Sequence, residues 1–448
     1  MTVDHAVGPA RVPKRARRGM EAFAERDFGL YWWSRIIDTI GIEMLVVTVG
    51  WQVYGLTGEA LDLGLVGLAQ FAPFALLFLV TGLVADRFPR VRVMAGCVAL
   101  QAVCATSLFL MTHTGNTQFG LILAVIILFG ISRSFLAPVQ HAIVIMLVPS
   151  AVFANAAIWT NVGNKVSRIV GPALGGLLIA VGGSNGEALV YGVAMVLLFL
   201  AFCLIVLIRP RAQAIAKEPV SIGSLLAGLH FIWTRKVTFA VTALDLFAVF
   251  LGGGATALLP IFAKDVLDAG PDGFGILRAA FMGGAFIGGL ILARLPVRGH
   301  AGLILLGTAG VFGFGGLIFG ASTNFWLSMT VLAVMGAADM VSVVIRQAVV
   351  QLITPDEVRG RVSAAVSMVI GASNDLGALE AGFTAHWWGA VPAVIIGGGA
   401  TVGVALVFGW LFPALRRVDS LNADRLIEQF QAPHDRHGAP VTASNLRR

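Results

Sequence analysis

Long apolar segments follow one another along almost the whole chain, separated by short polar stretches. A helix needs about 20 predominantly apolar residues to cross a hydrocarbon core about 30 Å thick. Twelve segments meet this requirement, so the pattern predicts twelve transmembrane helices. The first six are Leu30–Tyr54, Leu63–Val84, Arg92–His113, Phe119–Leu147, Phe153–Val181 and Ala188–Ile208. The second six are Val237–Phe262, Phe274–Leu295, Gly302–Gly320, Phe325–Leu352, Val362–Trp388 and Val391–Leu415.

The longest polar interruption divides these helices into two sets of six, and a weak internal repeat supports the division. Three pairs of residues recur at one offset of 206 positions: Pro149 and Pro355, Gly171 and Gly377, Gly176 and Gly382. Many secondary transporters are built from such repeated halves. The predicted fold class is an all-α membrane protein with two pseudo-symmetric six-helix bundles. Its expected parts are an N-terminal tail (1–28), a first bundle (29–208), a linker (209–236), a second bundle (237–415) and a C-terminal tail (416–448).

Composition agrees with membrane embedding of the whole chain. Hydrophobic residues make up 57% of the sequence, charged residues only 12%, and the mean hydropathy is +0.87. Soluble domains carry about 25% charged residues. The basic first 27 residues hold no apolar segment, so no signal peptide is expected. Cys97, Cys104 and Cys203 lie in apolar segments and are expected to be buried, without a metal, a cofactor or a disulfide.

Basic residues gather in alternate loops, which predicts the orientation in the membrane. Arg87 and Arg90 precede the third helix and Arg92 begins it, and further Arg and Lys residues occupy every second loop and the C-terminal tail. The intervening loops carry almost no basic residues, with Lys264 as the main exception. The protein is therefore expected in the inner cell membrane, with both termini in the cytoplasm. This distribution also explains the pI of about 9.8 without a nucleic-acid partner.

The segment after the second helix carries the first recognisable motif. It reads Gly82-Leu-Val-Ala-Asp86-Arg87-Phe-Pro-Arg90-Val-Arg92. This resembles the motif A loop of the major facilitator superfamily, although Pro89 and Val91 depart from the usual residues. The resemblance implies a cytoplasmic gate in which the Asp86 carboxylate faces the positive N-terminus of a neighbouring helix. The alternative is a plain basic turn at the cytoplasmic surface.

A second motif lies in the fifth helix, where Gly171, Pro172, Gly175 and Gly176 follow one another closely. It resembles motif C, which in this superfamily is associated with exporters and antiporters. Ser167 stands where that motif begins with Gly. Small residues in such a helix allow a neighbouring helix to approach closely.

A closer resemblance is to the siderophore- and drug-exporter branch that includes enterobactin exporters. It rests on three stretches: Gly50–Gly58, Thr354–Val362 and Gly371–Gly377. The turn Arg359-Gly360-Arg361 would be the second-half counterpart of the cytoplasmic gate loop. These motifs point to the branch and say little about the substrate.

Charged residues inside the predicted helices are the candidates for a functional site, because a charge in a membrane is costly and usually marks a pathway. They are Arg35, Asp38, Glu43, Arg133, Lys165, Arg168, Asp245, Asp339, Arg346, Asp375 and Glu380. One interpretation is a polar cavity whose carboxylates exchange protons. The other is a set of ion pairs between helices that stabilise packing.

Glu43 lies near mid-membrane and is the first choice for proton coupling; Asp38, Asp339 and Asp375 are further candidates. Asp38 could instead be neutralised by Arg35, three residues earlier. The remaining charged residues are candidates for the substrate cavity. Among them, Arg133, Lys165 and Arg168 form a basic group that would suit an anionic substrate.

Together these features predict a monomeric secondary transporter that exchanges protons for a small amphipathic or anionic molecule, such as a siderophore or drug. Alternatives are an importer or lipid flippase of the same fold. A membrane enzyme would need a clustered nucleophile or metal site, which the sequence does not indicate. A membrane sensor would need a cytoplasmic output domain.

Overall fold

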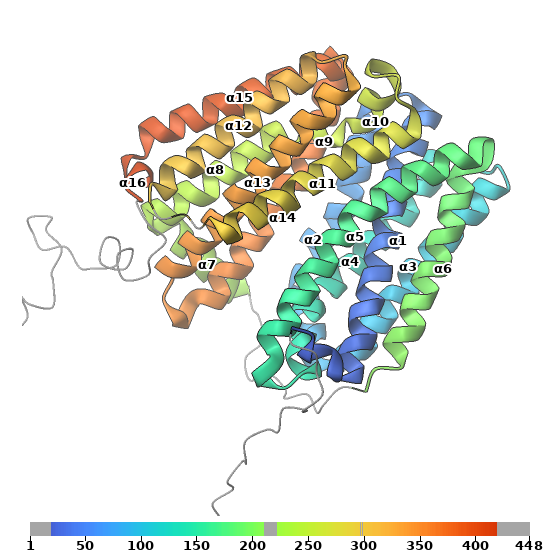
Figure 1. Ribbon diagram of the computed structural model, residues 1–448, viewed down its shortest axis with the longest axis horizontal. Helices are drawn as coiled ribbons and strands as arrows, with labels where there is room; N and C mark the ends of the chain where they lie inside the picture. Colours follow the sequence, from blue (N-terminus) through green and yellow to red (C-terminus); the bar gives the residue numbers. More distant parts are fainter. Residues whose placement is uncertain (1–18, 210–221, 296, 298, 419–448) are drawn as a thin grey trace, which may run out of the picture.

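The computed structural model describes residues 19–209, 222–295, 297 and 299–418, and within them it leaves a few side chains undescribed, including Asp86. The described residues form helices and loops without strands, as Figure 1 shows. The helices up to residue 209 are η1 (Glu21–Ala24), α1 (Arg26–Thr57), α2 (Ala60–Arg87), α3 (Arg90–His113), α4 (Phe119–Leu147), η2 (Ser150–Val152), α5 (Phe153–Gly182), η3 (Gly183–Asn185) and α6 (Gly186–Val206).

The later helices form the second group in Figure 1. They are α7 (Ile222–Thr234), α8 (Lys236–Gly252), α9 (Gly254–Ala257), α10 (Leu259–Ile261), η4 (Phe262–Val266), α11 (Gly270–Arg294), α12 (Ala301–Ala321), α13 (Phe325–Ile353), α14 (Asp356–Trp388), α15 (Ala390–Leu411) and α16 (Pro413–Arg416).

The predicted seventh helix, Val237–Phe262, is broken rather than continuous. The 17-residue helix α8 ends at Gly252, and the chain continues through the short helices α9 and α10. The break follows from three consecutive glycines, Gly252 to Gly254, which are poor helix formers. Ten described stretches suffice in length and composition to cross a membrane; one of them holds both α5 and α6, and α8 is not among them. The count of twelve stays a prediction.

The linker holds a helix that the apolar pattern did not predict. Helix α7 has only 13 residues, too few to span a membrane, and packs against α8 and α14. A Cβ built on Gly228 would lie 2.4 Å from the carbonyl oxygen of Arg361, so only glycine permits this approach. Residues 210–221 of the predicted linker lie outside the described part, as do residues 1–18 and 419–448 of the predicted tails.

Helix contacts repeat between the two halves of the chain. In the first half, α1 packs against α5 and α6, α2 against α4, and α3 against α4 and α6. In the second half, α8 packs against α14 and α15, α11 against α13, and α12 against α13 and α15. The halves meet where α5 packs against α11 and α2 against α14, and these two crossings are themselves equivalent.

The glycine repeat read from the sequence has a matching repeat of contacts. A Cβ on Gly171 of α5 would lie 3.1 Å from the Ile40 carbonyl of α1, and one on Gly377 of α14 would lie 2.9 Å from the Phe250 carbonyl of α8. Gly176 of α5 meets Gly275 of α11, while Gly382 of α14 meets Gly64 of α2. The repeat therefore marks equivalent close helix crossings, which supports two related bundles.

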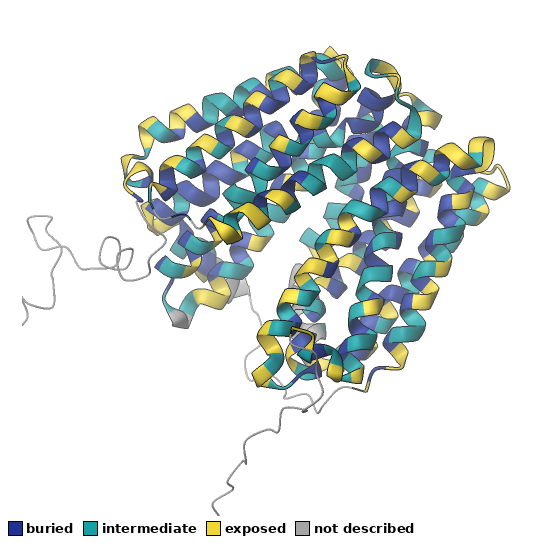
Figure 2. Ribbon diagram, viewed as in Figure 1, coloured by how far each residue is buried: buried dark blue, intermediate teal, exposed yellow. Residues whose placement is uncertain are grey.

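Among the described residues, the halves share a hydrophobic core at one end only. We call "the joined end" the end where α1 finishes and α2 begins; there, one hydrophobic core runs through both halves and includes Val53, Leu258, Phe274 and Ala381. Toward the opposite end, where α1 and α14 begin, each half has a core of its own. Figure 1 shows the ribbons diverging toward η1 and α7. Figure 2 shows buried positions concentrated inside each bundle.

Candidate functional site

Glu43 of α1 lies between charged groups of both halves. Its side chain is buried, and its Oε1 atom lies 3.2 Å from Nε of Arg168 on α5. Its Oε2 atom lies 3.7 Å from a guanidinium nitrogen of Arg278 on α11, in the second half. The Arg168 side chain is 47% exposed, so one partner of this buried carboxylate remains accessible. A single carboxylate thus links three helices across the interface.

The close approach of α5 to α1 depends on Gly171. A Cβ at this position would lie 2.7 Å from the Cβ of Glu43, closer than carbon atoms can pack. A Cβ on Gly175, four residues later, would lie 3.3 Å from the Cα of Met44 on α1, and Gly176 faces α11. Helix α5 continues through Pro172 without ending. The glycines of this motif therefore place Glu43 against α5 and bring α5 against the second half.

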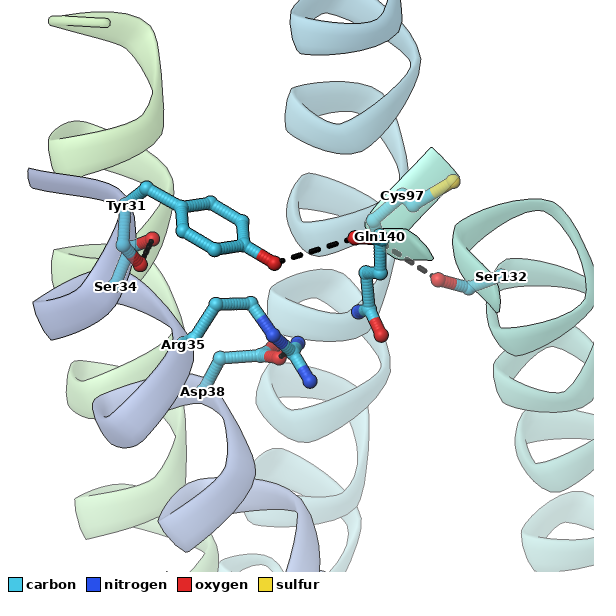
Figure 3. A network of polar contacts seen from close by, with 7 residues as sticks. All are labelled: Tyr31, Ser34, Arg35, Asp38, Cys97, Ser132 and Gln140. Atoms are coloured by element: carbon cyan, nitrogen blue, oxygen red, sulfur yellow. Dashed lines mark hydrogen bonds and ion pairs between the residues drawn. The ribbon is translucent and has the colours of Figure 1, made fainter. Parts of the chain in front are cut away.

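Asp38 belongs to a separate polar cluster inside the first half (Figure 3). Its carboxylate is buried and forms an ion pair with Arg35, one turn earlier on α1. Above this pair the hydroxyl of Tyr31 donates a hydrogen bond to the backbone carbonyl of Gln140 on α4, at 3.4 Å. On the far side Ser132 donates to the carbonyl of Cys97 on α3, at 2.8 Å. Asp38 is thus paired within its own helix.

Arg346 and Asp245 form a buried ion pair in the second half. Arg346 of α13 is 1% exposed and Asp245 of α8 is 7% exposed. Asp339 lies on the same helix as Arg346, seven positions away, but is not its partner. The pair connects α13 to α8 inside one bundle, so these two cavity candidates lie within the packing of the second half.

The remaining charged candidates lie where helices of the two halves face one another. Nζ of Lys165 on α5 lies 3.6 Å from the sulfur of Met340 on α13, next to Asp339. Arg133 of α4 donates to the side chain of Gln70 on α2, at 2.9 Å. Asp375 lies on α14, the helix that packs against α2. Glu380, also on α14, accepts a hydrogen bond from Thr384 at 2.6 Å.

Polar contacts also connect the halves at the joined end. The hydroxyl of Tyr54 on α1 donates to the carboxylate of Asp265 on η4, and the ammonium of Lys264 lies 5.4 Å above the Tyr54 ring. Glu59, at the start of α2, lies 3.0 Å from Nδ1 of His386 on α14. These contacts connect the halves in addition to the apolar core that both share.

The predicted gate segments are more helical than expected. Helix α2 runs to Arg87, so only Phe88 and Pro89 separate it from α3, which begins at Arg90. Arg87 is exposed, and Arg90 contacts the sulfur of Met146 on α4 at 3.5 Å. The surroundings of Gly82 and the Asp86 side chain lie outside the described part of the structure, and so does the gate contact predicted for Asp86.

The second gate segment was predicted as a turn and is part of a helix. Arg359, Gly360 and Arg361 lie in the first turns of α14, because the turn is already made at Pro355 and the helix begins at Asp356. Arg359 donates a hydrogen bond to the carbonyl of Thr354, at the end of α13, at 3.2 Å. A cation placed there complements the negative end of the preceding helix.

Two residues of this site were missed by sequence reasoning, Arg278 and Gln70. Arg278 interrupts an apolar segment in the same way as the charges that were chosen, so its signal was available. Gln70 carries no charge, and an isolated amide in a transmembrane helix gives little indication of a partner.

Comparison with known proteins identifies the family. The sequence model described as "transmembrane secretion effector" matches residues 19–440. The chain belongs to this family. It is a major facilitator superfamily protein, as the motif resemblance predicted, and it is a transporter rather than an enzyme.

Relatives of this transporter include efflux proteins. It is 23% identical over 388 residues to macrolide efflux protein A of Streptococcus pyogenes, covering 85% of this chain and 94% of that protein. It is 26% identical over 336 residues to the enterobactin exporter EntS of Shigella boydii, covering 74% and 78%. Their names, a macrolide efflux protein and an enterobactin exporter, agree with the drug- and siderophore-exporter resemblance of the three sequence stretches.

A solved structure shares the fold of this transporter. A bacterial homologue of the human lysosomal transporter Spinster, in an inward-facing and unoccupied conformation, superimposes with a TM-score of 0.66 at 15% identity. The match covers 91% of this chain and 98% of that one. The all-α major facilitator fold expected from the sequence is thereby confirmed.

Proposed function

We propose that this transporter is a proton-coupled exporter of a small amphipathic or anionic molecule, acting by alternating access. The arrangement around Glu43 is the observation that carries this proposal. A carboxylate can change its charge by binding a proton, and this one is bound to a guanidinium from each half. The names of the efflux relatives support export over the uptake or lipid-flipping alternatives.

The coupling follows from the charges. While Glu43 is ionised, it holds Arg168 and Arg278 together and helps to keep the halves in contact. When Glu43 is protonated, the two guanidinium groups lose their shared counter-charge and repel each other. Proton binding and the arrangement of the halves are therefore linked, and the linkage is reciprocal. Substrate binding has to weaken the same bridge before the halves separate at the joined end.

Replacing Glu43 with glutamine tests the coupling. The amide keeps the shape of the side chain but binds no proton, so accumulation driven by a pH gradient is expected to fall to the level of vesicles without the protein. Equilibration of the same compound down its own gradient should continue. The measurement uses everted membrane vesicles that contain the wild-type or the variant protein, and it follows the uptake of a macrolide and of enterobactin.

The matched control is Glu187→Gln, the same chemical change at the start of α6 in the same half. It should leave gradient-driven accumulation unchanged. If the Glu43→Gln protein still accumulates the probes when a pH gradient is applied, Glu43 is not the coupling residue. If wild type moves neither probe with or without a gradient, proton-coupled export of this substrate class is contradicted.

We further propose that the protein lies in the inner membrane as a monomer, with both termini in the cytoplasm and the joined end facing outward. The distribution of basic residues is the support for this orientation. A fluorescent protein fused after Arg448 is expected to fluoresce, whereas alkaline phosphatase at the same position is expected to be inactive. Active phosphatase there would reverse the proposed orientation.

A further inference from the structure

Several charged side chains within the described helices form no ion pair, and four of them lie near the interface between the halves. Asp38, Glu43 and Asp245 each form an ion pair. By contrast, among the residues that the structure describes, no ion pair involves the four side chains that follow. They are Lys165 and Arg133 in the first half, and Asp339 and Asp375 in the second. Both cations belong to one half, and both carboxylates belong to the other.

The first of these cations faces the first carboxylate where α5 passes α13. Lys165 reaches across the interface, because its Nζ atom lies 3.6 Å from the sulfur of Met340. Asp339 precedes Met340 on α13, and its carboxylate and the Lys165 ammonium attract each other without forming an ion pair. Both side chains are partly exposed. The two charges therefore lie near each other where the two halves meet.

The second cation and carboxylate lie on either side of the α2–α14 crossing. A Cβ on Gly67 of α2 would lie 3.2 Å from the Cβ of Ala378 on α14, and 3.6 Å from the carbonyl of Asp375. Gln70 follows Gly67 by about one helical turn and so lies on the same side of α2. It holds the guanidinium of Arg133, which attracts the Asp375 carboxylate from the first half.

We propose that the transported molecule is zwitterionic. Its anionic group binds Lys165 and Arg133, and its cationic group binds Asp339 and Asp375. This inference rests on the proposed function and narrows its substrate class. We call Lys165 and Arg133 the basic wall, and Asp339 and Asp375 the acidic wall. A molecule with one sign of charge would leave one wall without a counter-charge, and the wall of like sign would repel it. A molecule with both charges satisfies the two walls at once and connects the two halves.

Three forms of one compound provide the test. Ciprofloxacin is zwitterionic at neutral pH, its methyl ester is cationic, and its N-acetyl derivative is anionic. Wild-type protein in proteoliposomes is expected to transport the zwitterion at least about tenfold faster than either singly charged form, which corresponds to about 1.4 kcal/mol of discrimination. Passive entry of each form is measured in liposomes without protein and subtracted.

Two double variants show which wall reads which charge. Asp339→Asn with Asp375→Asn removes the acidic wall, and selectivity should shift toward the anionic derivative. Lys165→Gln with Arg133→Gln removes the basic wall, and selectivity should shift toward the cationic ester. Glu187→Gln is the control and should keep the wild-type order. The readout is the order of the three transport rates, in which each form serves as a control for the other two.

Several results would overturn the inference. If wild type transports all three forms alike, or the variants keep the wild-type order, the walls do not select charge. If none of the three forms moves while a macrolide or enterobactin is still exported, the substrate is not zwitterionic and the proposed function stands. The swap variant Lys165→Asp with Asp339→Lys exchanges one pair of charges between the walls. If it keeps the wild-type order of rates, the inference is also overturned, because these two side chains would then interact only with each other. Absence of any gradient-driven movement contradicts the proposed function itself.

Discussion

Replacing Arg346 with alanine is expected to destabilise the protein by about 3–5 kcal/mol, because it leaves a buried carboxylate without its counter-charge. Arg346 is 1% exposed and its partner Asp245 is 7% exposed. No solvent is available to replace the lost ion pair. The measurement is the thermal unfolding midpoint of the purified protein in detergent, together with its yield in the membrane.

Two further variants separate this effect from a general loss of charge. Arg416→Ala removes an exposed arginine, and the expected change in stability is within about 0.5 kcal/mol. The double variant Arg346→Met with Asp245→Leu removes both charges and should recover most of the lost stability. If Arg346→Ala unfolds at the wild-type temperature, the pair does not stabilise the second half.

Replacing Gly176 with alanine is expected to force the halves apart at the joined end. A Cβ at this position would lie 2.4 Å from the carbonyl oxygen of Pro271 and 2.9 Å from the Cα of Gly275, and both are backbone atoms that cannot rotate away. The protein should then populate a state in which α5 and α11 are separated, and transport should fall. Spin labels at Ser184 and Thr323, introduced after replacing the three native cysteines, measure this separation as a longer distance.

Equivalent and unrelated glycines supply the comparison. Gly382→Ala should produce the same change at the α14–α2 crossing, where its Cβ would lie 3.0 Å from the backbone of Ala60 and Gly64. Gly96→Ala, on α3, introduces a Cβ with no other atom within 4 Å and should change neither the distance nor transport. An unchanged label distance in Gly176→Ala would show that the crossing tolerates a methyl group.

Helix ends illustrate where sequence reasoning falls short. The polar residues around Asp86 and Arg359 were interpreted as loops, yet α2 extends to Arg87 and α14 begins at Asp356. Charged residues are compatible with a helix once it leaves the apolar layer, so polarity marks the edge of the membrane rather than the end of the helix. The positions of Pro89 and Pro355 are the better signal, because proline disfavours helical geometry at the residue before it.

The pairing of buried charges shows a different limit. Asp38 and Arg35 are three positions apart on one helix, so their pairing could be foreseen from the sequence. The pairing of Glu43 with Arg278, and of Arg346 with Asp245, joins helices that are far apart in the chain. Such pairs depend on which helices are neighbours and on their relative depth, and no local spacing records either.

The sequence by itself determined the membrane-embedded helices, the two related halves and the family. The length of the apolar segments, the glycine repeat at an offset of 206 residues and the motif residues can each be read from the sequence without knowledge of the fold. Only the tertiary structure decided that the halves share a core at one end and that Glu43 is shared between them. It also decided that, among the described residues, cations without an ion pair lie near carboxylates without one at the interface. Those features arise because helix packing brings together side chains from both halves, and the electrostatic energy of a buried charge depends on the neighbours that packing supplies.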